Sequence, residues 1–257
     1  MKVVILAGGF GTRIRDVAED IPKPMIPIGP FPIIWYIMNT YSKFGHTDFI
    51  ICLGYKGQLI KDFFLNYKPY TSDFTISFGE NGSIQFHNKS QHSNWTVTLV
   101  DTGLKSKTGS RISRIRDFIG QEDFMLTYGD GVSDINIKKL VEFHYSHNKI
   151  LTVTGVRPPG RFGEMMCDPS GKIQEFNEKP QATAGRISSG YFVASPRLFD
   201  YLNDNENLVF EEEPLKQLVS EEELMMYEHD GFWQPMDTSR DYQLLHSLYE
   251  DGKAPWI

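Results

Sequence analysis

The stretch MKVVILAGGFGTRIRD, residues 1–16, decides the fold of this chain. Residues 2–6 form a short apolar run rich in β-branched side chains, which predicts a buried β-strand. The run leads directly into Ala7 and a glycine-rich segment at residues 8–12. Glycines let backbone N–H groups approach an anion closely, because no Cβ atom stands in the way. The stretch therefore predicts a strand that ends in an anion-binding turn.

Further strands and helices alternate along the chain after this first strand. Apolar runs predict strands at 48–53, 123–128 and 151–156, and helical spacing predicts helices at 31–44, 57–67, 108–119, 135–147, 214–220 and 239–250. Shorter strands are expected at 74–78, 84–87, 95–100, 173–176 and 191–194 and near residue 165. This alternation is typical of a parallel sheet covered by helices. We expect an α/β fold with a Rossmann-like, mixed but mainly parallel central sheet, built as a single domain over residues 1–257.

The composition limits the classes of partner. The net charge of −7 disfavours a nucleic-acid-binding protein, which would show a basic patch or stripe. No stretch reaches the length of a membrane span, and the first apolar run is too short for a signal peptide. Cys52 and Cys167 show neither a CxxC pattern nor a neighbouring histidine cluster. We expect a cytoplasmic protein without nucleic-acid or membrane partners.

The glycine-rich turn does not match two familiar phosphate-binding motifs. Ile14 stands where a dinucleotide fingerprint needs its third glycine, and Thr12-Arg13 follows Gly11 where a P-loop needs Lys-Ser/Thr. Alone, the turn is as well explained by a structural role. Arg13 and Lys23 favour an anion site, because Pro22 and Pro24 stiffen the extended loop that presents the lysine ammonium.

Two aspartates are candidate ligands for a hard cation. Asp130 lies between two glycines after the apolar strand at 123–128, and Asp237 precedes Thr238 in the segment GFWQPMDT. Mg²⁺ in proteins is usually held by one or two carboxylates together with substrate phosphates. The alternatives remain open here: Asp130 also suits an ordinary turn, and Asp237 or Thr238 also suits the cap of the last helix.

A third group of polar residues lies in the second half of the chain. Glu178 and Lys179 end a predicted strand, and Ser188 and Ser189 form a small polar turn before the next one. Adjacent residues of an extended strand point to opposite sides, so the two charged side chains are better placed for two ligand contacts than for one ion pair. An ordinary charged strand end explains this piece equally well.

Together these motifs resemble the sugar-1-phosphate nucleotidyltransferases over nearly the whole chain. The shared pieces are AGGFGTR, PKPM, GDG, EKP and the late aspartate. Within that family, the strings IICLGYKG, TLVDTG, FMLTYGDGV, PPGRFG, EHDGFWQPMDT and GKAPW are most similar to the subfamily that transfers a cytidylyl group to glucose 1-phosphate.

The resemblance implies a role for each matching residue. It places the nucleotide near residues about 1–150, against Leu6, Ala7, Gly8, Gly9, Gly11, Thr12, Arg13, Arg111 and Asp130. It places the acceptor in the half at about 151–257, against Gly163, Glu178, Lys179, Ser188 and Ser189. Arg13, Lys23 and Asp130 would carry the catalysis, and Asp130 and Asp237 would hold Mg²⁺. Arg111 would contact the cytidine side, although Arg114 and Arg116 lie close by in sequence.

The implied reaction joins CTP and a sugar 1-phosphate to give a CDP-sugar and pyrophosphate, for the synthesis of bacterial surface-polysaccharide precursors. The subfamily tends to carry Asn-Gly-Gly where this chain has Ser188-Ser189-Gly190. Glucose 1-phosphate is the expected acceptor, and another sugar phosphate or a phosphorylated non-sugar is the alternative. A catalytically inactive regulatory subunit and a dinucleotide-dependent oxidoreductase are the alternatives of other classes. The resemblance also implies a homo-oligomer, a trimer or a hexamer.

Overall fold

The first strand of the chain forms the centre of the fold. In the computed structural model, which describes residues 1–11, 14, 20–79, 82–87, 94–158, 164–167, 172–177 and 185–257, strand β1 spans Lys2–Leu6. Val3, Val4 and Ile5 have no exposed surface. β1 pairs in parallel with β4 (Asp48–Leu53) on one side and with β8 (Phe124–Tyr128) on the other. Burial on both faces explains why its sequence is a continuous apolar run.

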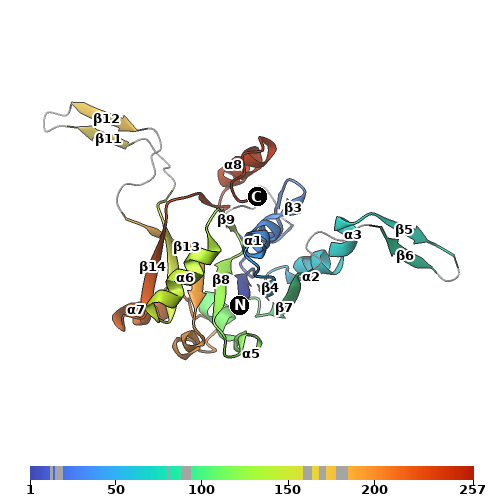
Figure 1. The fold of residues 1–257 in the computed structure, drawn as a ribbon, viewed down its shortest axis with the longest axis horizontal. Coiled ribbons are helices and arrows are strands. Elements are labelled where there is room, and N and C mark those ends of the chain that lie inside the picture. Colours follow the sequence, from blue (N-terminus) through green and yellow to red (C-terminus); the bar gives the residue numbers. More distant parts are fainter. Residues whose placement is uncertain are drawn as a thin grey trace.

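A seven-stranded sheet is built around β1 in the order β14-β10-β13-β8-β1-β4-β7. The remaining strands of this sheet are β7 (Thr96–Asp101), β10 (Leu151–Val156), β13 (Ile187–Ala194) and β14 (Leu224–His229). β13 runs antiparallel to both of its neighbours, and the other pairs in the sheet are parallel. The prediction of a mixed, mainly parallel α/β sheet is therefore confirmed (Figure 1).

Successive residues of β1 face two different hydrophobic cores. Val3 and Ile5 pack into one core with residues of α1 (Ile33–Ser42), α6 (Ile137–His147) and α8 (Ser239–Glu250). Val4 and Leu6 pack into a second core with residues of α4 (Thr108–Ser113), α5 (Arg116–Ile119), α7 (Glu213–Ser220) and the 3-10 helix η3 (Pro196–Tyr201). The sheet thus has a helical layer on each face. Its strands come from both halves of the chain, and the single domain at 1–257 stays a prediction.

Several short elements complete the chain. They are the 3-10 helix η2 (Lys23–Met25), α2 (Gly57–Leu65), α3 (Tyr67–Thr71), and the short strands β2 (Pro27–Ile28), β3 (Phe31–Pro32), β9 (Gly131–Ser133) and β15 (Trp233–Pro235). Two hairpins, β5 (Phe74–Ser77) with β6 (Ser83–Phe86) and β11 (Glu164–Cys167) with β12 (Ile173–Asn177), project from the body in Figure 1. In the described part of the chain, no helix combines the length and the apolar character that a membrane span needs.

The structure differs from the sequence prediction at several places. The strand expected at 191–194 begins at Ile187, so Ser188 and Ser189 lie within β13 and not in a turn before it. The helix expected at 57–67 ends at Leu65 and is followed by α3, and the helix expected at 108–119 is divided into α4 and α5. Strand β14 was not predicted. It lies at one edge of the sheet, and its residues are half-buried or exposed, whereas those of a central strand are buried on both faces.

Candidate active site

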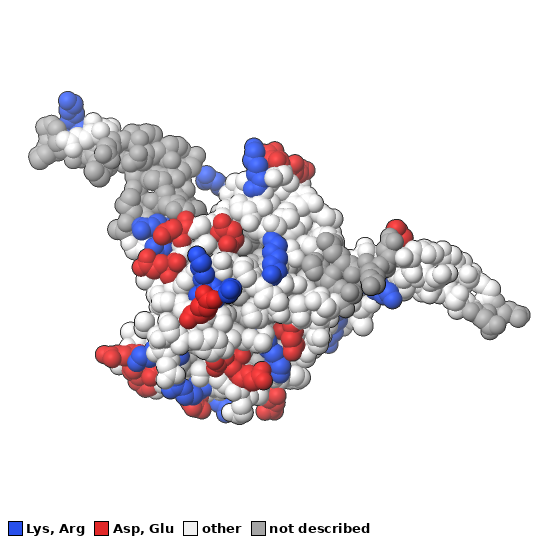
Figure 2. Space-filling model, viewed as in Figure 1, with Lys and Arg blue, Asp and Glu red and all other residues white. Residues whose placement is uncertain are grey.

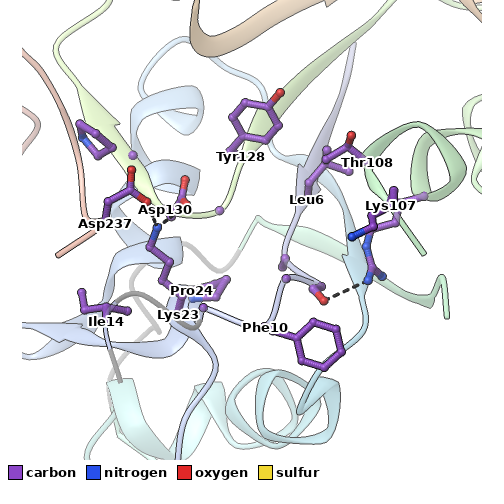
Figure 3. Close-up of a pocket in the computed structure, with 18 of the residues that line it drawn as sticks. Leu6, Phe10, Ile14, Lys23, Pro24, Lys107, Thr108, Tyr128, Asp130 and Asp237 are labelled. Atoms are coloured by element: carbon purple, nitrogen blue, oxygen red, sulfur yellow. Dashed lines mark hydrogen bonds and ion pairs between the residues drawn. The ribbon is translucent and has the colours of Figure 1, made fainter. Parts of the chain in front are cut away.

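A cavity of about 580 Å³ lies where β1 and β8 end at the same edge of the sheet. Its walls include Leu6, Ala7, Gly8, Gly9, Gly11, Lys23, Arg111, Asp130, Ser188, Ser189 and Asp237, all of which were predicted site residues. Figure 3 shows Lys23, Asp130 and Asp237 on one side of this cavity and Phe10, Lys107 and Thr108 on the other. Ligands of open α/β sheets bind at this edge, the carboxyl ends of the strands.

Backbone hydrogen bonds connect the glycine-rich turn to the end of the neighbouring strand β4. Ala7 donates its backbone N–H to the Cys52 carbonyl at 3.0 Å, and Tyr55 donates its N–H to the Gly8 carbonyl at 3.2 Å. A Cβ atom on Gly8 would lie 2.2 Å from a guanidinium nitrogen of Arg111. Only glycine therefore fits at position 8 while Arg111 keeps its place.

Arg111 ties three strand ends together beneath the turn. Its guanidinium donates hydrogen bonds to the Leu53 carbonyl at 2.8 Å, the Thr102 hydroxyl at 2.8 Å and the Gly8 carbonyl at 3.0 Å. The residue is 4% exposed, and burial lowers the pKa of its guanidinium from the ordinary value. Arg111 lines the cavity, whereas Arg114 donates to the Thr102 carbonyl and the Ser106 hydroxyl behind it. A contact between Arg111 and cytidine stays a prediction.

Asp130 and Asp237 are brought together by a two-stranded ladder outside the central sheet. β9 begins directly after Asp130, and β15 ends two residues before Asp237. The two strands pair antiparallel, with Gly131 opposite Pro235, and Met236 donates its N–H to the Asp130 carbonyl at 2.8 Å. Two aspartates far apart in sequence therefore reach the same side of the cavity.

Lys23 bridges the two aspartates. Its ammonium lies 2.7 Å from Asp130 Oδ2 and 2.5 Å from Asp237 Oδ1. Burial alone would disfavour the charged form, but the two carboxylates outweigh it and the pKa of Lys23 is raised from its ordinary value. The lysine begins the 3-10 turn η2 instead of the extended loop that its flanking prolines suggested; a proline in the first turn of a helix is well tolerated.

The donor set fits a hard divalent cation in part. Two carboxylates meet at one point, and among the described residues no third histidine, cysteine, aspartate or glutamate completes a metal-binding group. Mg²⁺ commonly takes its remaining oxygens from water and substrate phosphates. Asp130 and Asp237 are therefore able to hold such an ion together with a phosphate ligand, and other protein ligands are not required.

The serine pair lies on the wall of the cavity, with its hydroxyls already engaged. Ser189 is buried and donates its hydroxyl to the Thr154 carbonyl at 3.1 Å, and Ser188 accepts a hydrogen bond from the Gly190 N–H at 3.2 Å. The Ser189 carbonyl in turn accepts a hydrogen bond from the indole N–H of Trp233 at 2.9 Å. The pair thus shapes the wall and fixes an aromatic ring at its edge.

Sequence reasoning missed several residues of the cavity. Tyr128 and Thr108 both line it, and both donate their hydroxyls to the carboxylate of Glu211, Thr108 at 2.6 Å. Lys105 and Lys107 add two exposed ammonium groups to the same wall. The position of Tyr128 at the end of a predicted strand, directly before Gly129, was the available signal for it. Glu211 carried none, because it lies in a loop distant in sequence.

Some predicted site residues fall outside the described part of the structure. These residues are Thr12, Arg13, Gly163, Glu178 and Lys179. Their roles stay predictions.

The fold and the cavity are those of an enzyme class that binds nucleotides at the edge of a parallel sheet. Comparison with known proteins identifies the family. Residues 2–251 match the model of the nucleotidyl transferase family. The chain belongs to this family. It is 48% identical over 257 residues to the glucose-1-phosphate cytidylyltransferase of Salmonella typhi, covering 100% of this chain and 98% of that protein. It is also 40% identical to the probable glucose-1-phosphate cytidylyltransferase of Bacillus subtilis, covering 100% of this chain and 99% of that protein.

Solved structures show the same fold at lower identity. HddC from Yersinia pseudotuberculosis complexed with GMP-PN matches with a TM-score of 0.69 and 23% identity, covering 96% of this chain and 99% of that one. UDP-glucose pyrophosphorylase complexed with UDP-glucose matches with a TM-score of 0.69 and 18% identity, covering 98% of each chain.

Proposed function

We propose that this protein transfers the cytidylyl group of CTP to a sugar 1-phosphate, giving a CDP-sugar and pyrophosphate. The observation that carries the proposal is the 48% identity, over the full length, to a relative named glucose-1-phosphate cytidylyltransferase. The cavity supports it, because the glycine-rich turn, one lysine and two aspartates line a single space at the edge of the sheet. The product would serve as a nucleotide-sugar precursor for surface polysaccharides.

The proposed chemistry needs charge control and positioning more than a nucleophilic side chain. A phosphate oxygen of the acceptor attacks the α-phosphorus of CTP, and the bond from that phosphorus to the β-phosphate oxygen breaks as pyrophosphate leaves. The attacking phosphate is already ionised at neutral pH, so no general base is required. Lys23 and Arg13 offset the negative charge of the two reactants, as preorganised cations do in phosphoryl transfer.

Mg²⁺ is the cation that we propose for the carboxylate pair. Asp130 and Asp237 would hold it, and their oxygen atoms are the hard ligands that it prefers. When bound, the ion supplies neutralisation of charge on the triphosphate. The Lys23 ammonium adds one positive charge beside the same two side chains.

For the acceptor we propose the end of the cavity formed by Ser188, Ser189 and Trp233. A second cavity of about 420 Å³ adjoins it and shares Trp233, Pro235 and Asp237 with the first. Aromatic and proline surfaces beside carboxylates suit a sugar, which has apolar ring faces and hydroxyl edges. Glucose 1-phosphate is the proposed acceptor, and Gly163, Glu178 and Lys179 are proposed to contact it.

We also propose that the protein is a cytoplasmic homo-oligomer. Support comes from the hairpin β5–β6, which exposes Phe74, Ile76, Phe78 and Ile84 by 43% or more. Figure 2 shows few charged side chains on the visible, described part of this arm. An exposed apolar surface of this kind is typical of a contact with another protein chain.

The proposed reaction is tested by measuring pyrophosphate release from the purified protein. CTP, UTP, dTTP and GTP are each supplied with Mg²⁺ and with hexose 1-phosphates, heptose 1-phosphates or phosphorylated non-sugars. We expect CTP with glucose 1-phosphate to give the fastest release, and excess chelator to stop it.

Asp130→Asn and Asp237→Asn should each nearly abolish turnover while leaving thermal unfolding close to that of the wild type.

The outcomes separate the alternatives. A faster reaction with another acceptor would retain the cytidylyltransferase and replace the sugar. A preference for another nucleotide would overturn the base assignment. CTP binding without pyrophosphate release for any acceptor would indicate a regulatory nucleotide-binding subunit.

Lys23→Ala should cost on the order of 3 kcal/mol of transition-state stabilisation, as the loss of one preorganised polar contact does elsewhere.

A further inference from the structure

The position of the Lys23 ammonium is unusual for a residue whose proposed task is to bind phosphate. It lies between the same two carboxylates that are the proposed ligands of the divalent cation, within hydrogen-bond distance of one oxygen of each. The Lys23 side chain is 11% exposed, and those of Asp130 and Asp237 are 32% and 25% exposed. One protein cation and one metal ion would therefore compete for the same oxygen atoms.

The chain around Lys23 limits how this competition is resolved. Pro22 and Pro24 fix the backbone on both sides, and Pro24 is buried. Rotation of the lysine side chain can release the carboxylates without movement of this stiffened segment. A nucleotide triphosphate in the cavity offers the ammonium an alternative anion, so its phosphates would draw Lys23 away as the carboxylates become available.

We propose that Lys23 is the resident counter-ion of the Asp130–Asp237 pair in the nucleotide-free protein, and that it makes metal binding depend on the nucleotide. This inference rests on the proposed function, since it assumes that a nucleoside triphosphate and a divalent cation share the cavity. Lys23 then has two partners in turn, the carboxylates before binding and the phosphates afterwards. Removal of the lysine should weaken catalysis but strengthen binding of the metal alone.

The opposite signs of these two effects give a direct test. Binding of Mn²⁺ alone to the nucleotide-free protein is measured from the electron paramagnetic resonance signal of the unbound ion. We expect Lys23→Met to bind Mn²⁺ more tightly than the wild type by about five- to a hundredfold, the usual range for coupled sites. Lys23→Arg keeps a cation at this point and should stay near the wild type.

Two controls decide whether the effect is local. Lys107→Met removes the same charge from the wall of the same cavity without touching the carboxylates, and it should change Mn²⁺ affinity less than about twofold. Adding Asp130→Asn to Lys23→Met should remove the gain. Lys23→Gln, a neutral and polar replacement, serves if Lys23→Met does not fold, and it should also bind Mn²⁺ more tightly.

The inference is overturned if neither neutral variant binds Mn²⁺ more tightly than the wild type, or if Lys107→Met gives the same gain. Because the measurement contains no nucleotide, its result does not depend on which reaction the protein catalyses. Absence of pyrophosphate release beside the expected Mn²⁺ shift would reject the proposed function alone. Pyrophosphate release without that shift would reject this inference alone.

Discussion

A single side chain, that of Arg111, connects the ends of three strands of the central sheet. Its guanidinium holds the ends of β1, β4 and β7 in a fixed arrangement beneath the glycine-rich turn. An arginine presents five N–H donors in a rigid plane, which a lysine ammonium does not reproduce. The position of Gly8 in the cavity therefore depends on this side chain.

We predict that Arg111→Lys lowers the free energy of unfolding by roughly 2–3 kcal/mol, since it breaks hydrogen bonds from a buried charged donor. The KM for CTP should rise more than kcat falls, because the turn that is proposed to receive the nucleotide loses its support. Arg114→Lys is the matched control, since Arg114 lies on the next turn and does not line the cavity. Unchanged stability and an unchanged KM in Arg111→Lys would contradict the prediction.

Sequence analysis predicted which residues line the candidate site better than it predicted the contacts between them. Asp130 and Asp237 were expected near one another as ligands of one Mg²⁺ ion, and Lys23 was expected in the same site from the family resemblance. Their direct pairing was not predicted, since it depends on the β9–β15 ladder and on the side-chain conformation of Lys23. The hydrogen bond from the Ser189 hydroxyl to the Thr154 carbonyl was not predicted either, because the acceptor lies on a different strand, β10.

At the scale of elements, the start of α8 supports one of the two carboxylates. Thr238 caps this helix, and the Asp241 carboxylate accepts hydrogen bonds from the N–H groups of Asp237 at 3.1 Å and Thr238 at 2.9 Å. The other oxygen of Asp241 accepts from the Gln234 amide at 3.0 Å. The helix terminus thus holds the backbone of Asp237 through the Asp241 carboxylate.

We predict that Asp241→Ala lowers stability by about 1 kcal/mol, as the loss of a helix-capping interaction does. It should also raise the Mg²⁺ concentration needed for half-maximal activity. Thr238→Ala removes the cap hydroxyl but leaves Asp241 available to the Asp237 N–H, so it should reduce stability without changing the Mg²⁺ requirement. Equal Mg²⁺ requirements for both variants would show that capping is the whole role of Asp241.

A second element, α6, carries a pair of histidines that share one hydroxyl. His147 accepts the Lys149 N–H at Nδ1, so its Nε2 donates to the Thr152 hydroxyl at 2.8 Å, and the same hydroxyl lies 2.8 Å from Nδ1 of His144. His144 is 3% exposed. Burial, together with the nearby His147, lowers the pKa of His144 from 6.5 to about 4.

This shift predicts a loss of stability in mild acid. The unfolded chain takes up a proton on His144 near pH 6.5, and the folded protein resists protonation until about pH 4. The stabilisation is therefore complete above pH 6.5 and declines as the pH falls toward 4, by on the order of 3 kcal/mol. Urea unfolding between pH 7.5 and 4.5 should show a shallower pH dependence for His144→Gln than for the wild type.

The elements that were predicted correctly are those with a strong periodic pattern and a buried position. β1, β4 and β10 have the predicted bounds, since their sequences are rich in apolar and β-branched residues. α4 and α5 were expected as one helix because the apolar spacing continues across residues 114 and 115, although α4 ends at Ser113 and α5 begins at Arg116. β14 and the short ladder β9–β15 depend on pairing partners, which local sequence does not specify.

At the scale of the whole molecule, the projecting hairpin predicts self-association. Ile76 and Ile84 are paired across β5 and β6 and are 43% and 54% exposed. We expect Ile76→Asp combined with Ile84→Asp to convert an assembled protein to monomers, because charges would have to be buried in the contact. Sedimentation velocity gives the mass of each form. Leu65→Asp, an exposed apolar position on α2, is the control and should leave the assembly intact. A wild-type protein that sediments as a monomer would contradict the prediction.

The pairing of Lys23 with Asp237 across 214 positions also has a consequence for biosynthesis. A ribosome makes the first member of this pair near the beginning of translation and the second near its end. The central strands β1, β4 and β8 are all complete long before β15 has been synthesised. Domains generally begin to fold from the amino-terminal side as they emerge. The nascent protein can thus bring its central strands together while the candidate site still lacks one of its two carboxylates, and we expect a product released before position 237 to be folded in part and inactive in the proposed reaction.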